Sequence, residues 1–195
     1  TSRPSLILIA GYDLFTGADL WMHTRVSAIE FLSGFIMSAA VGAPLGIAMG
    51  WLRRVRLLLE PAVMAFYSVP RTALLPLVIV WFGIGLKTQA TIVFLGAVFP
   101  ILINTMTGVH QVDPSLVRAA RSFGANDGQV FARVLLPGAL PFIMGGIRLG
   151  LGRALIGVIV GEMYVSTAGI GNLIMTYQSG LNLSLIHISE PTRPY

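Results

Sequence analysis

Long apolar segments alternate with short polar ones along this chain. The apolar segments cover approximately residues 29–51, 57–82, 90–109 and 142–160. About 20 consecutive apolar residues span the hydrocarbon core of a bilayer as a helix. We therefore expect an all-α integral membrane protein with about four to five transmembrane helices.

Small residues recur at every fourth position of the first apolar segment. On a helix this spacing forms one ridge on which another helix packs closely. The alternative is a glycine-rich helix without a defined partner, and Pro44 within it can kink the helix. The ridge consists of Gly34, Ser38, Gly42, Gly46 and Gly50.

The second apolar segment is interrupted by Pro61, Pro70 and Pro76. Proline cannot continue a regular helical hydrogen-bond ladder, so we expect this segment to be bent or broken and shielded by protein. Arg71 lies within it. This arginine is either a charge on a transport path or a headgroup charge at the cytoplasmic interface.

The composition agrees with a membrane protein. Of the 195 residues, 55% are hydrophobic and 11% are charged, with a mean hydropathy of +0.80, whereas soluble domains carry about 25% charged residues. The chain has no cysteine, which excludes a disulfide framework and a thiolate metal site. The formal net charge is +5, but the basic residues lie in loops where the positive-inside rule explains them, so nucleic acid is not an expected partner.

Basic residues also predict the orientation. Arg53, Arg54 and Arg56 follow the first apolar segment directly and mark the cytoplasmic side. Two further crossings place residues 111–137 on the same side and leave Lys87 alone on the other.

Three regions are expected. Residues 1–27 form a periplasmic or interfacial lead-in, and residues 28–183 form the transmembrane domain with a cytoplasmic loop at 111–137. The sequence begins at threonine without a signal-peptide pattern, so we interpret it as a fragment. Residues 184–195 resemble translated sequencing-adapter read-through, and we expect this tail to be non-native.

The loop at 111–137, called here the polar segment, is predicted to form two short helices. Asp113 is a good N-cap and Pro114 suits the first helical position. Gly124 suits a left-handed helix terminus, and the second helix should end before Pro137. One apolar stripe is formed by Leu116, Ala119, Ala120 and Phe123.

The polar segment resembles the signature loop of binding-protein-dependent ABC importer permeases. That loop reads Glu-Ala-Ala, three residues, Gly, nine residues, Ile, any residue, Leu-Pro. The matching positions here are Ala119, Ala120, Gly124, Val134, Leu136 and Pro137. Arg118 stands in place of the family glutamate, so a contact made by that carboxylate is not carried over.

Further stretches resemble the aliphatic-sulfonate, taurine and nitrate branch of these permeases. They are VPRTALLPLVIVWFGIG, VFPILINTMTGV, ARSFGA, LLPGALPFIMGGIRLGLG and GEMYVSTAGIGNLI, within residues 21–177. The resemblance implies a type I importer permease fold in the bacterial inner membrane, in contact with lipid. The implied partners are a cytoplasmic ATPase, a second permease copy and a periplasmic substrate-binding protein.

In this family the signature loop forms a coupling helix that sits in a cleft of the ATPase. The alternative for an amphipathic helix here is that it lies on the lipid surface. The residues expected to couple to the ATPase are Leu116, Arg118, Ala119, Ala120, Arg121, Phe123, Gly124 and Pro137.

Neither a catalytic set nor a metal set is recognisable. The chain lacks a phosphate-binding loop of the Gly-x4-Gly-Lys-Ser/Thr type, so ATP and Mg²⁺ are expected on the partner ATPase. His23, His110 and His187 have no ligand spacing. The chain is therefore not expected to be an enzyme.

Ionisable residues in the last apolar segment are candidates for a transport path. Such residues usually face a bundle interior or a water-filled path, and Arg153 and Glu162 are our candidates, with Arg153 suited to an anion. Alternatively, Arg148 reaches the cytoplasmic headgroups and Glu162 reaches periplasmic water.

The expected function is the permease of an ATP-driven importer for small anions, such as aliphatic sulfonates, taurine or nitrate, or for a different small solute. A gradient-driven secondary transporter would also be apolar with broken helices. It would not need the signature loop, and such carriers often show internal repeats, which this sequence lacks.

Overall fold

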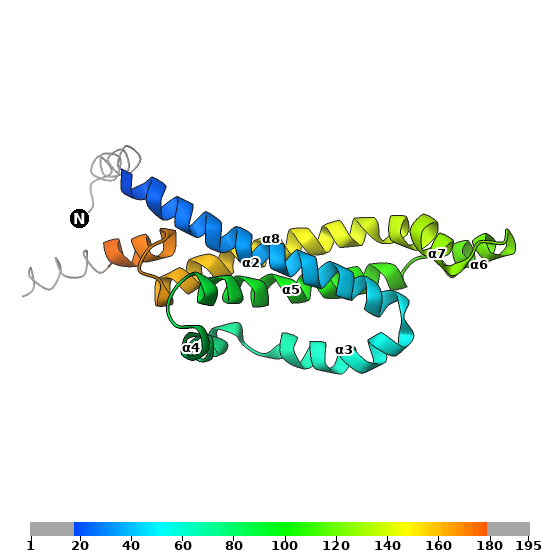
Figure 1. Cartoon of the computed structure of the whole chain (residues 1–195), viewed down its shortest axis with the longest axis horizontal. Helices are drawn as coiled ribbons and strands as arrows, with labels where there is room; N and C mark the ends of the chain where they lie inside the picture. Colours follow the sequence, from blue (N-terminus) through cyan, green and yellow to red (C-terminus); the bar gives the residue numbers. More distant parts are fainter. Residues whose placement is uncertain (1–17, 179–195) are drawn as a thin grey trace, which may run out of the picture.

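A computed structural model describes residues 18–178, which form helices joined by short turns. Three long helices lie along the long axis of the molecule: α2 (Ala18–Trp51), α5 (Leu86–His110) and α8 (Leu136–Val165) (Figure 1). Helix α5 packs against both α2 and α8. The buried core therefore centres on α5, where Val93, Ala97 and Ile101 are fully buried.

Three helical stretches are long and apolar enough to cross a membrane. They are Leu20–Trp51, Leu86–His110 and Asp127–Val165. A fourth span is possible if the bent pair of α3 (Arg53–Ser68) and α4 (Arg71–Phe82) is counted as one. The all-α membrane fold is confirmed; the described residues contain three spans, or four with the bent pair, against the four to five expected.

Helix α2 begins ten residues before the expected domain boundary. Residues 18–27, which we expected in the lead-in, are helical. They contain neither glycine nor proline. The Thr24 hydroxyl donates to the Leu20 carbonyl at 2.7 Å, and Ser27 is buried. Residues 1–17 and the suspected tail at 184–195 lie outside the described residues.

The small-residue ridge of α2 lies directly on α5. Each glycine meets the residue 59 positions later: the pairs are 34 and 93, 42 and 101, 46 and 105, and 50 and 109. The Ser38 hydroxyl donates to the Phe94 carbonyl across the same contact, at 3.1 Å. The constant offset means that α2 and α5 run parallel, with one ridge in continuous contact. Pro44 lies inside α2 without interrupting it.

The predicted break between residues 57 and 82 is confirmed. Helices α3 and α4 meet at an angle of 105°, and Pro70 is the extended residue before α4. Pro61 and Pro76, by contrast, lie inside helices. Of these three prolines, only Pro70 follows a helix end. Its predecessor Val69 is extended, as expected because a proline disfavours helical angles in the residue before it.

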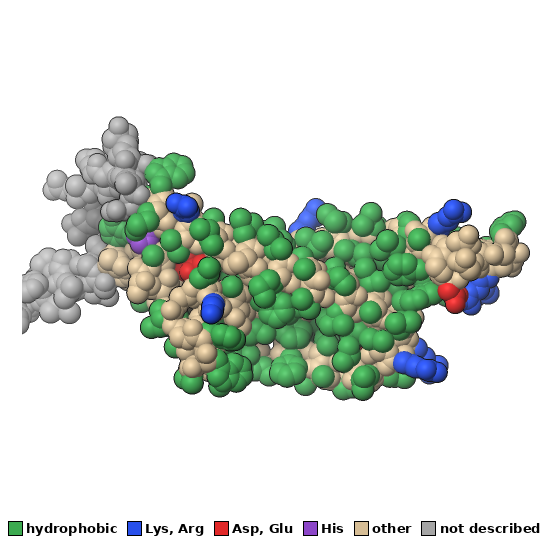
Figure 2. All heavy atoms as spheres, in the orientation of Figure 1, with side chains coloured by type: hydrophobic (Ala, Val, Ile, Leu, Met, Phe, Trp, Pro, Cys, Tyr) green, Lys and Arg blue, Asp and Glu red, His purple; other side chains and the backbone are tan. Residues whose placement is uncertain are grey.

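Charged side chains concentrate toward the two ends of the molecule, and the middle of the visible face is mostly apolar (Figure 2). The start of α3, with Arg53 and Arg54, lies at the same end as the polar segment (Figure 1). Lys87, in the first turn of α5, lies at the opposite end. Arg25 belongs to the N-terminal part of α2 at that same end, so the expectation that Lys87 is alone there is wrong.

Candidate functional site

The first helix of the polar segment is capped as predicted. It is α6 (Pro114–Ser122), with Pro114 at its first position. The Asp113 carboxylate accepts a hydrogen bond from the Ser115 backbone N–H at 2.7 Å. This hydrogen bond, which favours the charged form, lowers the pKa of Asp113. The cap fixes where the exposed helix begins.

The turn after α6 depends on Gly124. Its φ is +82°, in the left-handed region, and an added Cβ would meet nothing within 4 Å. The Ala125 N–H donates to the Ala120 carbonyl at 3.1 Å, and the Gly124 N–H donates to the Arg121 carbonyl at 2.9 Å. Glycine is required here by the backbone angle, as predicted, and not by crowding.

The second helix of the polar segment does not end before Pro137, and this prediction is wrong. Asn126 and Gln129 form a reciprocal capping box that starts α7 (Asp127–Val130). A π-helical turn, η1 (Phe131–Leu135), follows and runs directly into α8. Pro137 falls in the first turn of α8, immediately after the π-helical turn. The regular i→i−4 hydrogen bonds are already interrupted in the π-helical turn, so a proline, which has no N–H to donate, disturbs the helix less at this position.

The apolar stripe predicted on α6 divides between two directions. Ala120 and Val117 pack against the buried cluster of Val109, Val130 and Leu135. Leu116 is 54% exposed and Phe123 is 93% exposed. Large apolar side chains thus stand at the tip of the molecule, and no element within residues 18–178 covers them.

Arginines flank this exposed surface. The Arg121 Nη2 donates to Asp127 Oδ1 at 3.0 Å, which braces α6 against α7. Arg118 is exposed and has no ion pair with any residue in the range 18–178. Its positive charge is therefore available to a partner.

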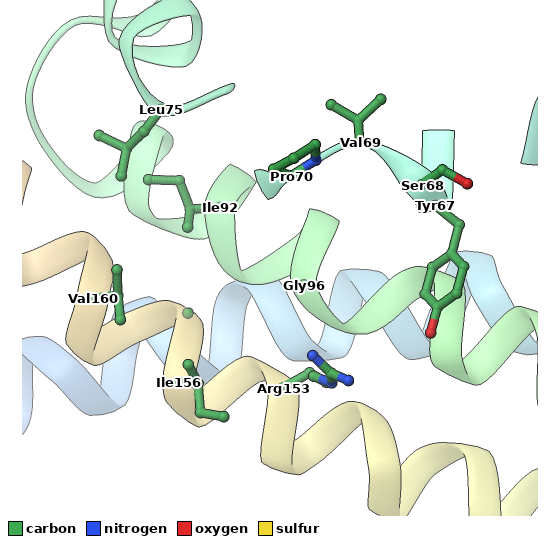
Figure 3. A pocket seen from close by; sticks show the side chains of 11 residues that line it. Tyr67, Ser68, Val69, Pro70, Leu75, Ile92, Gly96, Arg153, Ile156 and Val160 are labelled. Carbon is green, nitrogen blue, oxygen red and sulfur yellow. The ribbon is translucent and has the colours of Figure 1, made fainter. Parts of the chain in front are cut away.

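A second candidate site is an open cavity of about 470 Å³ at the junction of α3 and α4, lined also by α5 and α8 (Figure 3). Arg153 of α8 is the one charged side chain among its described lining residues. Tyr67, at the end of α3, also lines the cavity, and its ring lies against Phe99 with centroids 6.1 Å apart. Arg148 is exposed and is not among the lining residues.

Glu162 lies outside this cavity and is fully buried, so the expectation that it reaches periplasmic water is wrong. Its Oε2 accepts from the Gly171 N–H at 2.6 Å. Its carboxyl also lies beside that of Glu30, from α2. The turn after α8 (residues 166–169), called here the outer turn, folds back over the end of α8 and encloses the carboxylate. An added Cβ at Gly169 would lie 2.3 Å from Glu162 Cδ.

Two side chains of α2 complete this arrangement, called here the outer polar cluster. His23 Nδ1 accepts from the Gly169 N–H at 2.8 Å, and Ser27 Oγ accepts from the Ile170 N–H at 2.9 Å. Together with Glu162 they cap the helical residues 170–178. The sequence analysis missed this role, although Glu30 carried a signal as an acidic residue within an apolar span.

In the range 18–178, no group of three or more histidine or acidic side chains could hold a metal ion. The geometry instead offers an exposed amphipathic tip and a singly charged cavity.

Residues 42–189 match a protein family described as "Binding-protein-dependent transport system inner membrane component". The chain is 36% identical to the taurine transport system permease protein TauC of Escherichia coli over 88% of its length, and 37% identical to an aliphatic sulfonates transport permease protein, SsuC, of Bacillus subtilis, also over 88%. The chain spans 62% of each of these relatives.

A solved structure, described as inward-facing conformations of the MetNI methionine ABC transporter, has the same fold. The TM-score is 0.65 at 22% identity, and the match covers 96% of this chain and 94% of that one. At this identity the likeness concerns the fold alone.

Proposed function

Because this chain belongs to the family of binding-protein-dependent transport system inner membrane components, we propose that it is a permease subunit of an ATP-driven importer for small anions, with aliphatic sulfonates as the leading substrate class. Taurine, nitrate or another small solute is the alternative. The names of its relatives, which concern taurine and aliphatic sulfonates, support this choice.

The observation that carries the proposal is the exposed tip of α6. Leu116 and Phe123 present apolar surface at the arginine-rich end of the molecule, where water is an unfavourable neighbour. An apolar face flanked by arginines fits a protein groove with a polar rim. We assign this role to Leu116, Ala119 and Phe123, with Arg118 and Arg121 at the rim and a cytoplasmic ATPase as the partner.

The connection behind the tip suits the transmission of force. Helix α6 joins α8 through one turn, at Gly124, and then through continuous helix from Asp127 to Val165. Ala120 anchors α6 to the body, and Pro137 lies within the connecting helix. Movement of an ATPase that holds α6 would therefore reach the spanning helix over a short, ordered path.

The remaining parts of the assembly follow from the same proposal. ATP and Mg²⁺ would be bound by the ATPase, and a periplasmic binding protein would deliver the substrate. A second copy of the permease would complete the path in the inner membrane. Arg153 is the path residue that we propose; for Glu162, its buried hydrogen bond supports a role in holding the outer turn instead.

The test compares Phe123→Ser and Leu116→Ser with Ile84→Ser, an exposed apolar residue in the turn before α5. In proteoliposomes, the two α6 variants should lose ATPase association and ATP-dependent uptake, and Ile84→Ser should keep both. If all variants bind the ATPase normally, α6 is not the coupling surface. Uptake driven by an ion gradient without ATP would instead indicate a secondary transporter.

A further inference from the structure

The cavity beside Arg153 has the size and lining of a small-ligand site. Its volume of about 470 Å³ lies within the roughly 300–1,000 Å³ of typical ligand pockets. Three different helical regions contribute to it: the break between α3 and α4, the first half of α5, and the second half of α8 (Figure 3). Nothing in the proposed coupling role of α6 accounts for it.

Arg153 has no compensating charge among the described residues that line the cavity. Arg153 makes neither an ion pair nor a hydrogen bond with another residue of the range 18–178, and no carboxylate is among the described lining residues. The Arg153 side chain is exposed in the isolated chain. A guanidinium without an acidic neighbour favours an anion, and its planar donors suit an oxyanion such as a sulfonate. Tyr67 lines the same cavity, and a tyrosine hydroxyl can donate one more hydrogen bond.

The rest of the lining is apolar. The lining residues include Leu75, Ile92, Ile156 and Val160, labelled in Figure 3. An inorganic anion has no surface that gains from such walls, whereas an alkyl tail does. An ammonium group on that tail would find no acidic partner here and would lose its hydration.

We infer that this cavity is a specificity site for alkanesulfonate monoanions, in which Arg153 and Tyr67 bind the sulfonate and the apolar walls bind the alkyl tail. The inference rests on the proposed function for its substrate class. It adds that the permease itself distinguishes an alkanesulfonate from the zwitterion taurine and from nitrate, independently of any binding protein.

Two ligands of nearly equal shape test the selectivity. Propane-1-sulfonate and taurine differ by a terminal methyl in place of an ammonium. Binding to the permease–ATPase complex in lipid nanodiscs, without binding protein, can be measured by ligand-observed NMR, with empty nanodiscs as the reference. Propane-1-sulfonate should bind at least about 10-fold more tightly than taurine, and each methylene from methanesulfonate upward should strengthen binding roughly fourfold.

Variants assign the binding to the cavity. Arg153→Gln should weaken propane-1-sulfonate binding by about 10- to 100-fold, and Tyr67→Phe by roughly 10-fold. Arg153→Lys, which keeps the charge, should retain most of the affinity. Arg148→Gln is the matched control, since it removes a positive charge from the same helix outside the cavity.

Equal binding of taurine, an equal effect of Arg148→Gln, or no saturable binding to the wild-type complex would each overturn the inference. ATP-dependent uptake by the complete importer with its binding protein is measured in parallel. If that uptake persists while the isolated complex binds no sulfonate, the proposed transport function stands and only the specificity site is refuted.

Discussion

The contact between α2 and α5 can be tested with a single methyl group at Gly46. An added Cβ there would lie 2.5 Å from the Leu102 carbonyl oxygen and 2.8 Å from Thr105 Cβ. Both obstacles are backbone or near-backbone atoms, which cannot turn aside. Restoring an ordinary separation of 3.4 Å from the carbonyl oxygen requires the helices to move apart by 0.9 Å, the difference from 2.5 Å.

The expected cost follows from two opposing terms. Alanine is favoured over glycine inside a helix by about 0.5–1 kcal/mol. Overpacking a tight contact costs about 1–3 kcal/mol. Gly46→Ala should therefore be destabilising by roughly 0–2.5 kcal/mol, whereas the same change in open space should be stabilising.

Helix α8 offers matched controls for this change. Added Cβ atoms at Gly145 and Gly152 would meet nothing within 4 Å in this chain. Unfolding in mixed micelles with increasing SDS, followed by the helical circular dichroism signal, gives the free energy of each variant. The free energy of unfolding of Gly46→Ala should be about 1–3 kcal/mol lower than that of Gly145→Ala or Gly152→Ala. Equal free energies for the three variants would refute close packing along the ridge.

Three further outcomes are expected. Gly124→Val places a β-branched side chain at φ +82°, so it should abolish substrate-stimulated ATPase activity while membrane insertion, measured by fractionation, stays normal. Normal coupling in this variant would contradict the role of the turn at Gly124. The pKa of Asp113 is lowered, so its charged cap is fully present above the ordinary carboxyl pKa and is lost as the pH falls through the lowered value. Hydrogen-exchange protection of the Ser115 amide should therefore decline only in acid. In Asp113→Ala this protection should be absent even at neutral pH. Glu162→Ala leaves the buried Gly171 N–H without its acceptor, which should cost about 1–3 kcal/mol locally and speed proteolysis of the outer turn. Glu162→Gln should remain close to wild type. Equal proteolysis of wild type and both variants would show that the Glu162 carboxylate does not stabilise this turn.

The sequence predicted features that depend on local geometry. The small-residue ridge, the Asp113 cap and the left-handed Gly124 each follow from positions a few residues apart. The partner of the ridge did not follow, because residues 59 apart come together only through the packing of whole helices. The helix break was predicted from three prolines, but only the structure identifies Pro70 as its position.

The errors at Pro137 and Glu162 have physical causes. A proline usually ends a helix, but a π-helical turn just before Pro137 changes the hydrogen-bonding register and lets the helix continue. A carboxylate at the end of a span usually reaches water, but Glu162 is buried by a turn that folds back on it and accepts a hydrogen bond from the Gly171 N–H. The cavity at Arg153 was only partly foreseen, because its shape depends on how α3 and α4 fold against α5.

The outer polar cluster has a consequence for biogenesis. His23 and Ser27 receive hydrogen bonds from backbone groups that lie 146 and 143 residues later in the chain. At a synthesis rate of about 5–20 residues per second, the polar end of α2 waits roughly 7–30 s for those donors. During that interval His23, Ser27 and Glu30 need water or another partner. Helix α2 can therefore settle to its final depth only after the last part of the described chain has been made.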